Sequence, residues 1–556
     1  MIIGIDMGGT HTDGVVVDRG EIIKTAKKTT DRQCLLTTIW SILQELLEGL
    51  DKKKIFRINL STTVSTNAIV ENKKSSVGMI IQCGPGMSYD FSSAGDQIEL
   101  ISGYIDHRGT AVSEVPEAEV HRIKNSFITN KIESIGIVSK FSNRNPGHEK
   151  QISKILEDSF GTITLGHSLS GKLNFPRRVH TAYLNSSVHA TFKYFADSFE
   201  ESLKKEGIEA PVHILKADGG TISLDTARNT PAETILSGPA ASSMGLSALF
   251  SENQDGVLLD IGGTTTDIFF LADGVHLFEP LGISIGSHKT LIRAIYSASI
   301  GFGGDSHVRL ENNKIKIGPQ RKGFPVAFGG KHLTPTDALV ALGKIKAGNK
   351  EQAVEAIEQL ASKMNLTANE AANKILNEMS ESIKEKTISL LEKINSRPVY
   401  TVHELLEGKK IKPQFINMIG GPAEALAPFL EQAFGLTVKY PKLHQVANAL
   451  GAALAKPTME INMHADTERG MLSVPEVDIY EAIDQSYDLS MAEKRALDIV
   501  KESTASLGGT PDSIEAEIIE SSSFNMIKGF MSTSKNIRVR AQTKPGLAYS
   551  IKGMNK

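Results

Sequence analysis

The sequence predicts an α/β protein with two related domains and a small C-terminal α+β region. The main observation is an internal repeat, because residues 6–13 recur as residues 260–267 with six of the eight positions identical. Apolar runs flank each copy, so each copy is expected to form a buried strand, a tight Gly-Gly turn and a second strand. Residues 351–395 indicate helices, because their apolar side chains recur at spacings of three and four.

The composition is that of an ordinary folded protein. At 556 residues, the chain is long enough for roughly two to four domains. Hydrophobic residues make up 40% and charged residues 22%, which argues against a largely disordered chain. The formal net charge is only −3, so nothing points to nucleic acid or an anionic membrane as a partner.

Two cysteines, Cys34 and Cys83, exclude a disulfide framework and a Cys-rich zinc or iron–sulfur site within one chain. No apolar run approaches the roughly 18–20 residues that a membrane span needs. Residues 1–6 reach an acidic side chain without a basic segment, which is not typical of a signal peptide. We therefore expect a cytoplasmic protein with no membrane partner.

Domain boundaries are expected near residues 200 and 456. Residues 1–200 carry the first predicted hairpin, and residues 201–456 carry the second. Residues 457–556 form the predicted C-terminal appendage.

Three segments refine this organisation. The helices predicted over 351–395 should end at Arg397-Pro398. Residues 416–430 indicate a strand, a Gly-Gly turn and a helix. Residues 444–455 indicate a helix of small residues, closed by Lys456-Pro457.

The C-terminal hundred residues show local signals but no catalytic motif. Ser490–Glu493 resembles a capping box that opens a helix. A Gly508-Gly509 break follows it. Residues 536–541 alternate polar and apolar side chains, as in a half-buried strand.

The repeated turn suits phosphate binding. Glycine lets backbone N–H groups approach an anion closely, and threonine hydroxyls add donors. An acidic residue at the strand end repels phosphate, but it can orient a hydrated Mg²⁺ that bridges phosphates. A single Gly-Gly-Thr hairpin is commonplace. An ordinary hairpin, however, has no need to repeat the aspartates, glycines and threonines together.

These hairpins resemble those of the actin-like ATPase superfamily, in which two hairpins clamp the ATP phosphates from two domains. The resemblance implies two actin-like (ribonuclease H-like) ATPase domains around an ATP cleft. A third element of that superfamily binds adenosine at a Gly-Gly strand-to-helix turn, and residues 416–424 match it in order. The alternative is a turn in which glycine only permits close packing.

Further segments resemble the hydantoinase A/5-oxoprolinase family, and the resemblance runs from residue 1 to about 455. The matching segments are residues 61–68, 218–220, 237–241, 318–330 and 333–338. The chain departs from that pattern at His11 and in a looser glycine loop at residues 301–306. The C-terminal part is shorter than the family pattern leads us to expect, so the resemblance implies a stand-alone A-type subunit without a fused B-type subunit.

The resemblance implies an ATP-dependent hydrolase subunit that opens a cyclic amide of the hydantoin or 5-oxoproline type, with ATP and Mg²⁺ as cofactors. ATP would phosphorylate the amide oxygen, and the enzyme would position the groups and neutralise charge. Asp6 and Asp260 would orient Mg²⁺, while Asp13 and Asp267 would each act as a base or as a structural cap. The implied phosphate and adenosine contacts are Gly8, Gly9, Thr10, Thr12, Gly262, Gly263, Thr264, Thr265, Thr266, Gly420, Gly421, Pro422 and Glu424. The implied substrate contacts are Thr62, Thr63, Asn67, Asp218, Gly219 and Gly220.

Other functions stay open at this point. The chain is also compatible with the ATP-binding subunit of a related ATP-dependent carboxylase, or with a small-molecule kinase of the same fold. A third alternative is an ATPase that acts on a protein partner. The sequence leaves open which cyclic amide is used, whether a hydantoinase B-type subunit is required, and whether the chain forms a homo-oligomer.

Overall fold

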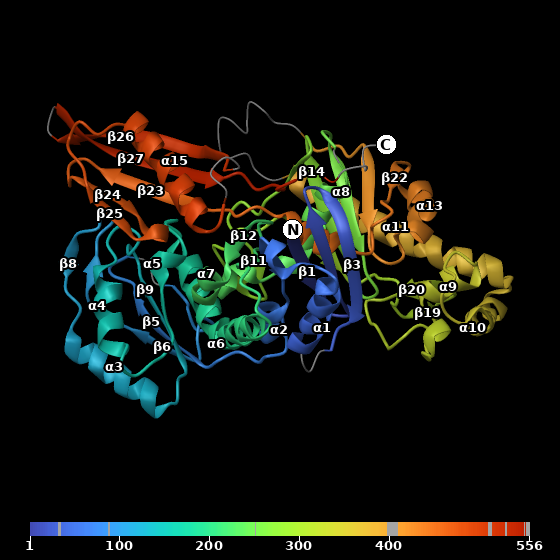
Figure 1. The fold of residues 1–556 in the computed structure, drawn as a ribbon. Coiled ribbons are helices and arrows are strands. Elements are labelled where there is room, and N and C mark those ends of the chain that lie inside the picture. The colour runs from blue at the N-terminus through green and yellow to red at the C-terminus, as the bar shows by residue number, and fades with distance from the viewer. Residues whose placement is uncertain are drawn as a thin grey trace. The chain divides into compact units, whose positions relative to one another are not determined.

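The computed structural model describes residues 1–31, 35–86, 89–250, 252–396, 410–509, 514–528, 531–549 and 551 (Figure 1). Cys34 and the expected helix end at Arg397-Pro398 lie outside these residues. The chain divides into two compact units, which we describe separately. Unit 1 comprises residues 1–240, 279–294 and 452–550, and unit 2 comprises residues 241–278, 295–451 and 551–556.

The first sheet of unit 1 carries the first copy of the repeat. Its strand order is β12-β11-β4-β1-β2-β3, with β1, β4 and β11 parallel and β1, β2 and β3 antiparallel. The strands are β1 (Ile2–Met7), β2 (His11–Asp18), β3 (Glu21–Thr29), β4 (Arg57–Ser61), β11 (Val212–Leu215) and β12 (Thr221–Ser223). The accompanying helices are α1 (Leu35–Leu47), α2 (Val64–Val70), α6 (Phe175–Lys205) and α7 (Leu224–Asn229). α1 and α6 pack their apolar faces into the core of this sheet, where Leu43, Phe192 and Phe199 are fully buried.

The second sheet of unit 1 is parallel and has the order β10-β9-β5-β6. Its strands are β5 (Val77–Gln82), β6 (Gln97–Leu100), β9 (Ser134–Ser139) and β10 (Ile163–Leu165). The neighbouring elements are β7 (Tyr104–Ile105), β8 (Ala111–Ser113), α3 (Glu117–Thr129), α4 (Gly147–Leu156) and α5 (Gly166–Leu169). β16 (Ser284–Ile285) and β17 (His288–Lys289) form a short hairpin in the same unit. Phe127 of α3 lies directly over Gly78, where a side chain would collide with the ring.

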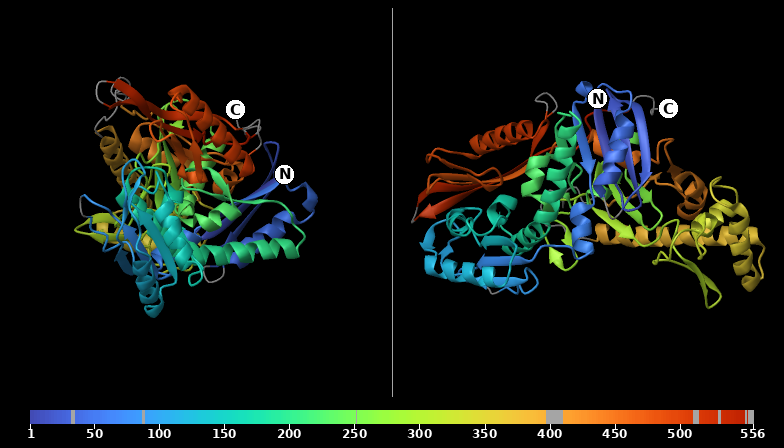
Figure 2. Two further views of the ribbon diagram at one scale, coloured as in Figure 1. Left: turned by 90° about the vertical axis from the view of Figure 1, so that its left-hand side faces the viewer. Right: turned by 60° about the horizontal axis from the view of Figure 1, so that its bottom comes forward.

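The C-terminal part of unit 1 is an α+β region, with sheet order β25-β24-β23-β27-β26 and a helix packed on the sheet (Figure 2). Its elements are β23 (Glu460–Asp466), β24 (Met471–Val474), β25 (Ile479–Ala482), α15 (Leu489–Ser506), β26 (Ala516–Lys528) and β27 (Met531–Thr543). The predicted alternation over residues 536–541 is confirmed, because Ile537, Val539 and Ala541 are buried on one face of β27. The predicted capping box is wrong. Asp488 caps α15 instead, accepting a bond from the Met491 amide at 2.9 Å.

Unit 2 contains the second copy of the repeat. Its sheet has the order β15-β14-β13-β21-β22, with β18 also paired to β14. Its strands are β13 (Gly256–Ile261), β14 (Thr266–Ala272), β15 (Val275–His276), β18 (Ser297–Ile300), β21 (Phe415–Ile419) and β22 (Thr437–Lys439), with a separate hairpin of β19 (Val308–Glu311) and β20 (Lys314–Ile317). Its helices are α9 (Pro335–Ala341), α10 (Lys350–Met364), α11 (Ala368–Asn395), α13 (Ala423–Phe434) and α14 (Ala447–Leu454), and α8 (Ser237–Leu249) crosses the boundary between the units.

The helices predicted in this unit are confirmed. α10 and α11 cover the segment predicted as helical, β21 and α13 give the expected strand and helix around a glycine turn, and α14 is the expected helix of small residues. Apolar side chains of α11 and α13 share one core with the strands β13, β14 and β21. Within the described part of the chain, no helix has the length and apolar character needed to cross a membrane.

Candidate functional site

The first hairpin turns tightly between β1 and β2. The Gly8 amide donates to the His11 carbonyl at 3.0 Å, and a side chain at position 8 would come within 2.8 Å of that oxygen. Gly9 is exposed, and a side chain there would meet nothing within 4 Å. The turn therefore leaves its backbone accessible at Gly9, as close approach of an anion requires. Thr10 beside it is half-buried.

The aspartates of the first hairpin lie opposite each other in the register of β1 and β2. Asp6 is 4% exposed and pairs with Asp13 across the strands. Lys27 on β3 lies opposite Asp13 in the register of β2 and β3, and its Nζ lies 2.7 Å from Asp13 Oδ1. The Thr12 hydroxyl is buried and bonds to the Thr30 hydroxyl at 2.9 Å. A lysine cation thus stands next to the carboxylate pair of this hairpin.

The second hairpin repeats this backbone geometry between β13 and β14. The Gly262 amide donates to the Thr265 carbonyl at 2.9 Å, and Asp260 lies opposite Asp267 in register. Thr264 and Thr265 are exposed at its tip. Thr266 is buried and donates to the Phe302 carbonyl at 2.6 Å.

The carboxylates of the second hairpin have a different environment. Asp260 Oδ2 accepts a bond from Ser242 Oγ at 2.6 Å and one from Asn448 Nδ2 at 3.3 Å. Burial and the charge of Asp260 raise the pKa of Asp267 to about 7, although a bond from Ser299 opposes the shift. Two neighbouring carboxylates that resist joint ionisation suit a divalent cation, which would relieve their repulsion. The residues present therefore fit Mg²⁺.

A glycine loop, residues 301–306, packs against the second turn. The Gly304 amide donates to the Gly262 carbonyl at 3.0 Å, and the Asp305 amide donates to the Gly263 carbonyl at 2.7 Å. A side chain on Gly303 would come within 2.6 Å of the Gly263 carbonyl, so only glycine allows this backbone contact. The loop that departs from the family pattern is therefore part of the second hairpin's surroundings.

Side chains from two further segments hold this loop. Arg321 Nη2 lies 2.8 Å from Asp305 Oδ2, and its Nη1 lies 3.4 Å from Thr264 Oγ1. The Thr336 hydroxyl, at the start of α9, donates to the Gly304 carbonyl at 2.8 Å and contacts Asp305 Oδ1 at 3.1 Å. The late family segment around Thr336 thus supports the tip of the second hairpin.

The third glycine motif follows β21, the parallel neighbour of β13. Gly420 has a φ of +104°, and a side chain there would collide with the Ile261 carbonyl. His444 Nδ1 contacts the Gly420 carbonyl at 2.9 Å. Gly421 is exposed with open space around it, Pro422 caps α13, and Glu424 is exposed in its first turn. Because β13 and β21 run parallel, this motif and the second hairpin lie at the same end of one sheet.

The predicted substrate residues of unit 1 follow the parallel strands β4 and β11 beside β1. Thr62 is buried, and its backbone amide donates to Ser237 Oγ at 3.2 Å. Asn67 donates to the Thr63 hydroxyl at 3.1 Å within the first turn of α2. Asp218, Gly219 and Gly220 form the turn after β11, and the Gly220 amide donates to Asp218 Oδ1 at 3.0 Å.

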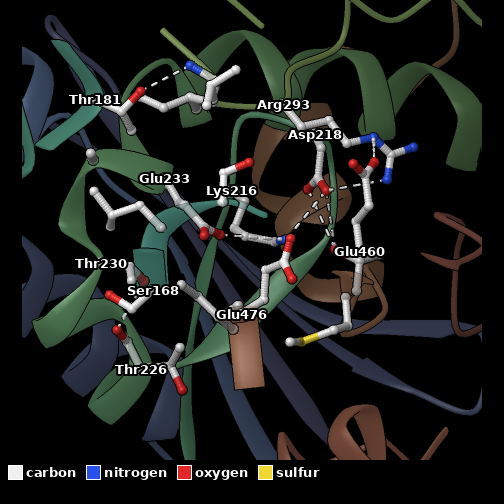
Figure 3. A pocket seen from close by; sticks show the side chains of 18 of the residues that line it. Ser168, Thr181, Lys216, Asp218, Thr226, Thr230, Glu233, Arg293, Glu460 and Glu476 are labelled. Carbon is white, nitrogen blue, oxygen red and sulfur yellow. Dashed lines mark hydrogen bonds and ion pairs between the residues drawn. The ribbon is translucent and has the colours of Figure 1, made fainter. Parts of the chain in front are cut away.

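A pocket of about 150 Å³ opens beside that turn, within unit 1 (Figure 3). Of the six predicted substrate residues, only Asp218 lines it. Lys216 Nζ lies 3.2 Å from Asp218 Oδ2 and 3.6 Å from Glu233 Oε2. Arg293 lies 3.9 Å from Asp218 and 3.7 Å from Glu460. Figure 3 shows these charged side chains converging from separate segments.

The pKa values of the acids in this pocket shift in different directions. Burial opposes ionisation of Asp218, but the Lys216 and Arg293 cations hold its pKa below the usual range. Burial raises the pKa of Glu233 and outweighs the attraction of Lys216. Burial also raises the pKa of Glu476, although it accepts bonds from Asn462 and from the Gly171 amide. The pocket thus combines fixed charges with carboxyl groups that keep a proton more readily than free ones.

Sequence reasoning missed several of these groups. Lys216 stands two residues before the predicted Asp218, so its closeness in sequence to the motif of residues 218–220 is a signal that could have found it. Arg321, Ser242 and Asn448 had no such signal, because each reaches the second hairpin from a distant segment. Among the described residues, no group of three or more His, Cys, Asp or Glu side chains is placed to hold a metal.

The chain belongs to the hydantoinase/oxoprolinase family. The family model "Hydantoinase/oxoprolinase" matches residues 178–461, and "Hydantoinase/oxoprolinase N-terminal region" matches residues 2–160. The predicted family resemblance is confirmed.

Curated relatives are distant and mostly longer. The chain is 23% identical to caprolactamase subunit alpha of Pseudomonas jessenii, over 81% of this chain and 69% of the relative. It is 24% identical to the acetophenone carboxylase gamma subunit of Aromatoleum aromaticum, over 66% of this chain and 58% of the relative. It is 23% identical to 5-oxoprolinase 1 of Arabidopsis thaliana, over 72% of this chain but only 36% of the relative.

Solved structures confirm the fold. The ATP-dependent caprolactamase from Pseudomonas jessenii superposes with a TM-score of 0.71 at 19% identity, covering 97% of this chain and 87% of that chain. Nucleotide-free acetone carboxylase superposes with a TM-score of 0.69 at 16% identity, covering 99% and 88%. The predicted α/β fold, with each copy of the repeat in its own sheet and a C-terminal α+β region, is confirmed.

Proposed function

We propose that this chain is an ATP-dependent hydrolase subunit that opens a cyclic amide through phosphorylation of the amide oxygen. The observation that carries the proposal is the repeated hairpin: each copy pairs two aspartates in register behind a glycine turn, and the backbone of the first turn is accessible at Gly9. Relatives named caprolactamase and 5-oxoprolinase support the same class of reaction.

In this proposal both hairpins bind ATP phosphates. Gly8, Gly9, Thr10 and Thr12 serve the first hairpin, and residues 262–266 serve the second. Asp6 and Asp260 orient Mg²⁺, which neutralises phosphate charge when it is bound. Gly420, Gly421, Pro422 and Glu424 face adenosine. The open space around Gly9 and Gly421 supports these assignments, because ligand atoms can reach the backbone there.

The proposed reaction consumes one ATP and two waters for each ring opened. The amide oxygen bonds to the γ-phosphorus, and ADP leaves. Water then adds to the activated ring carbon, and the ring C–N bond breaks to give an amine and an acyl phosphate. A second water releases inorganic phosphate and the carboxylate. The protein contributes orientation and electrostatic stabilisation of the developing charge rather than a covalent intermediate.

The catalytic aspartates have distinct proposed roles. Asp267 is the better candidate base, because its raised pKa favours accepting a proton near neutral pH. Asp13 is the better candidate structural cap, because Lys27 holds its carboxylate at 2.7 Å.

We assign the polar part of the substrate to the pocket beside Asp218. A cyclic amide offers one carbonyl acceptor and one N–H donor. Lys216 and Arg293 supply cationic donors, and Glu233 supplies an acceptor. Thr62, Thr63, Asn67, Gly219 and Gly220 remain proposed contacts at the neighbouring strand ends.

The test is phosphate release by the purified chain with Mg-ATP and a panel of 5-oxoproline, hydantoin, N-methylhydantoin and caprolactam. The proposal predicts stimulation by at least one cyclic amide, with the ring-opened acid as product. A stable phosphorylated product would instead identify a kinase. Stimulation by a protein without any small substrate would identify a partner-directed ATPase.

A carboxylase subunit is the second candidate, because one relative is a gamma subunit of acetophenone carboxylase. Addition of bicarbonate and a ketone to the same assay separates the two, since only a carboxylase forms a carboxylated product. Relatives named as subunits also support a partner chain of the hydantoinase B type. An inactive chain that gains activity with such a partner would fit either candidate, and the product then decides.

A further inference from the structure

A second pocket, of about 220 Å³, lies in unit 1 away from the glycine hairpins and away from the pocket beside Asp218. Three arginines line it: Arg108 after β7, Arg144 before α4, and Arg469 between β23 and β24. Tyr480 on β25 completes one wall. The pocket therefore joins the region of the parallel sheet to the C-terminal sheet.

Arg108 already has its partners. Its guanidinium forms three hydrogen bonds to the Asp466 carboxylate at 2.9–3.0 Å and lies 3.1 Å from Glu468. Asp466 also accepts the backbone amides of Glu468 and Arg469. The acids of this pocket are thus occupied by Arg108 and by the backbone.

Arg144 differs from Arg108 in its hydrogen bonds and ion pairs. Its Nε is buried and, among the residues that the structure describes, has no hydrogen-bond partner, and no ion pair of Arg144 is found there either. Burial, followed by the charge of Arg538, lowers the pKa of Arg144 to about 9, so positive charge around it is not fully compensated. Burial, followed by the charges of Arg144 and Arg538, lowers the pKa of His464 to about 2.

A second donor in the pocket is also unused. The Tyr480 hydroxyl is buried and lacks a hydrogen-bond partner within the described ranges. The acids that act on it hold other partners: Asp478 binds Lys150 at 2.6 Å, Glu149 binds His167 at 2.6 Å, and Glu476 binds Asn462 and the Gly171 amide at 2.7 Å. A buried donor without a partner costs free energy, and a ligand oxygen would remove that cost.

The backbone is shaped to bring the arginines together. Gly109 has a φ of +90°, and a side chain there would come within 2.6 Å of Arg469 Nη1 and 2.9 Å of Arg144 Cβ. Arg469 Nη1 also donates to the Arg108 carbonyl. Glycine at position 109 therefore lets Arg144 and Arg469 approach the same loop.

We propose that this pocket binds a small oxyanion, a phosphate or a carboxylate group, through Arg144, Arg469 and Tyr480. Arginine presents donors in a planar fork that matches either group, and a tyrosine hydroxyl adds one more. The volume is below the roughly 300 Å³ of typical drug-sized sites, which favours an inorganic ion or a small metabolite. Such a ligand would link two regions of unit 1, and it would therefore raise the stability of the whole chain.

The experiment is calorimetric titration of the full chain with inorganic phosphate and, separately, with malonate, each against chloride at equal ionic strength. Saturable binding of one probe is expected, and the stronger probe identifies the ligand group. Arg144→Met should weaken that binding at least tenfold, and Tyr480→Phe at least threefold. Arg122→Met, on exposed α3, should leave it unchanged.

Tyr480→Phe removes one hydroxyl and keeps the ring, so it decides the matter if Arg144→Met does not fold. Binding of neither probe would overturn the proposal. So would binding that is unchanged in the folded Arg144→Met and Tyr480→Phe variants, because the ion would then sit elsewhere. Neither result bears on ATP use at the hairpins.

Discussion

The two copies of the repeat share a backbone and differ in what surrounds it. Both turns close with the same amide-to-carbonyl bond, and both place two aspartates opposite each other. The first pair has Lys27 beside it, whereas Asp267 in the second pair has a pKa raised to about 7. The second turn is also braced by a glycine loop and by Arg321. The two hairpins therefore share their backbone geometry but differ in their electrostatic surroundings. The two copies should respond differently to mutation.

The largest expected effect is on ATP turnover when either aspartate proposed to orient Mg²⁺ is changed. Asp6→Asn and Asp260→Asn should each lower kcat by on the order of 100-fold, because charge stabilisation acts mainly in the transition state. Phosphate release measures the loss, and thermal unfolding should show little change in Tm. Asp158→Asn, at an exposed site, is the control. Wild-type turnover in both aspartate variants would rule out the proposed mechanism.

The brace on the second hairpin predicts a smaller, one-sided effect. Arg321→Gln removes the ion pair that holds Asp305 over the turn. We expect the KM for ATP to rise about tenfold, roughly 1.4 kcal/mol, with a smaller change in kcat. Arg309→Gln, whose main ionic partner is Glu311, is the matched control. Equal effects of both arginine variants would show that the brace plays no specific part.

The sheet of the second hairpin also predicts a pH-dependent stability. Burial lowers the pKa of His276 to about 4. Between about pH 6.5 and pH 4, His276 is therefore protonated in the unfolded chain but largely neutral in the folded chain. Stability should therefore fall as the pH drops from about 6.5 towards 4, by roughly 2–3 kcal/mol. His276→Gln should flatten this slope in urea unfolding at pH 7.5 and pH 5. The exposed His121→Gln should keep it, and an unchanged slope in His276→Gln would contradict the assignment.

The smallest expected effect concerns Lys27 and the first hairpin. Lys27→Met removes the cation beside Asp13, which leaves the carboxylate pair more negative. The Mg²⁺ concentration for half-maximal activity should then fall two- to threefold. The change is small because a partly exposed ion pair contributes little free energy. Lys193→Met on α6 serves as the control. A higher Mg²⁺ requirement in Lys27→Met would mean that the lysine itself contacts phosphate.

The sequence was sufficient for those parts that depend on local pattern. The two hairpins, the helices over 351–395 and the glycine turn after β21 all follow from periodicity and turn chemistry, and all are confirmed. The start of α15 was placed two residues late. Both Asp488 and Ser490 are suitable caps, and the actual geometry, not the pattern, selects the aspartate.

The parts that sequence reasoning could not supply depend on contacts between distant segments. Ser242 and Asn448 reach Asp260 from the helices α8 and α14, which pack against each other, and no spacing rule links them to the repeat. Arg293 likewise reaches Asp218, beside Lys216, from a segment that is distant in the sequence. The raised pKa of Asp267 also depends on packing, since Asp13 has the same motif position but a lysine neighbour.

The most direct test of the central claim is the ratio of phosphate released to ring-opened acid formed. It would be measured on the cyclic amide that stimulates the chain best, with any required partner present. The proposed mechanism predicts a ratio of one, no acid without ATP, and loss of both products together in Asp260→Asn. Acid formed without ATP, or phosphate retained in a stable phosphorylated product, would contradict it.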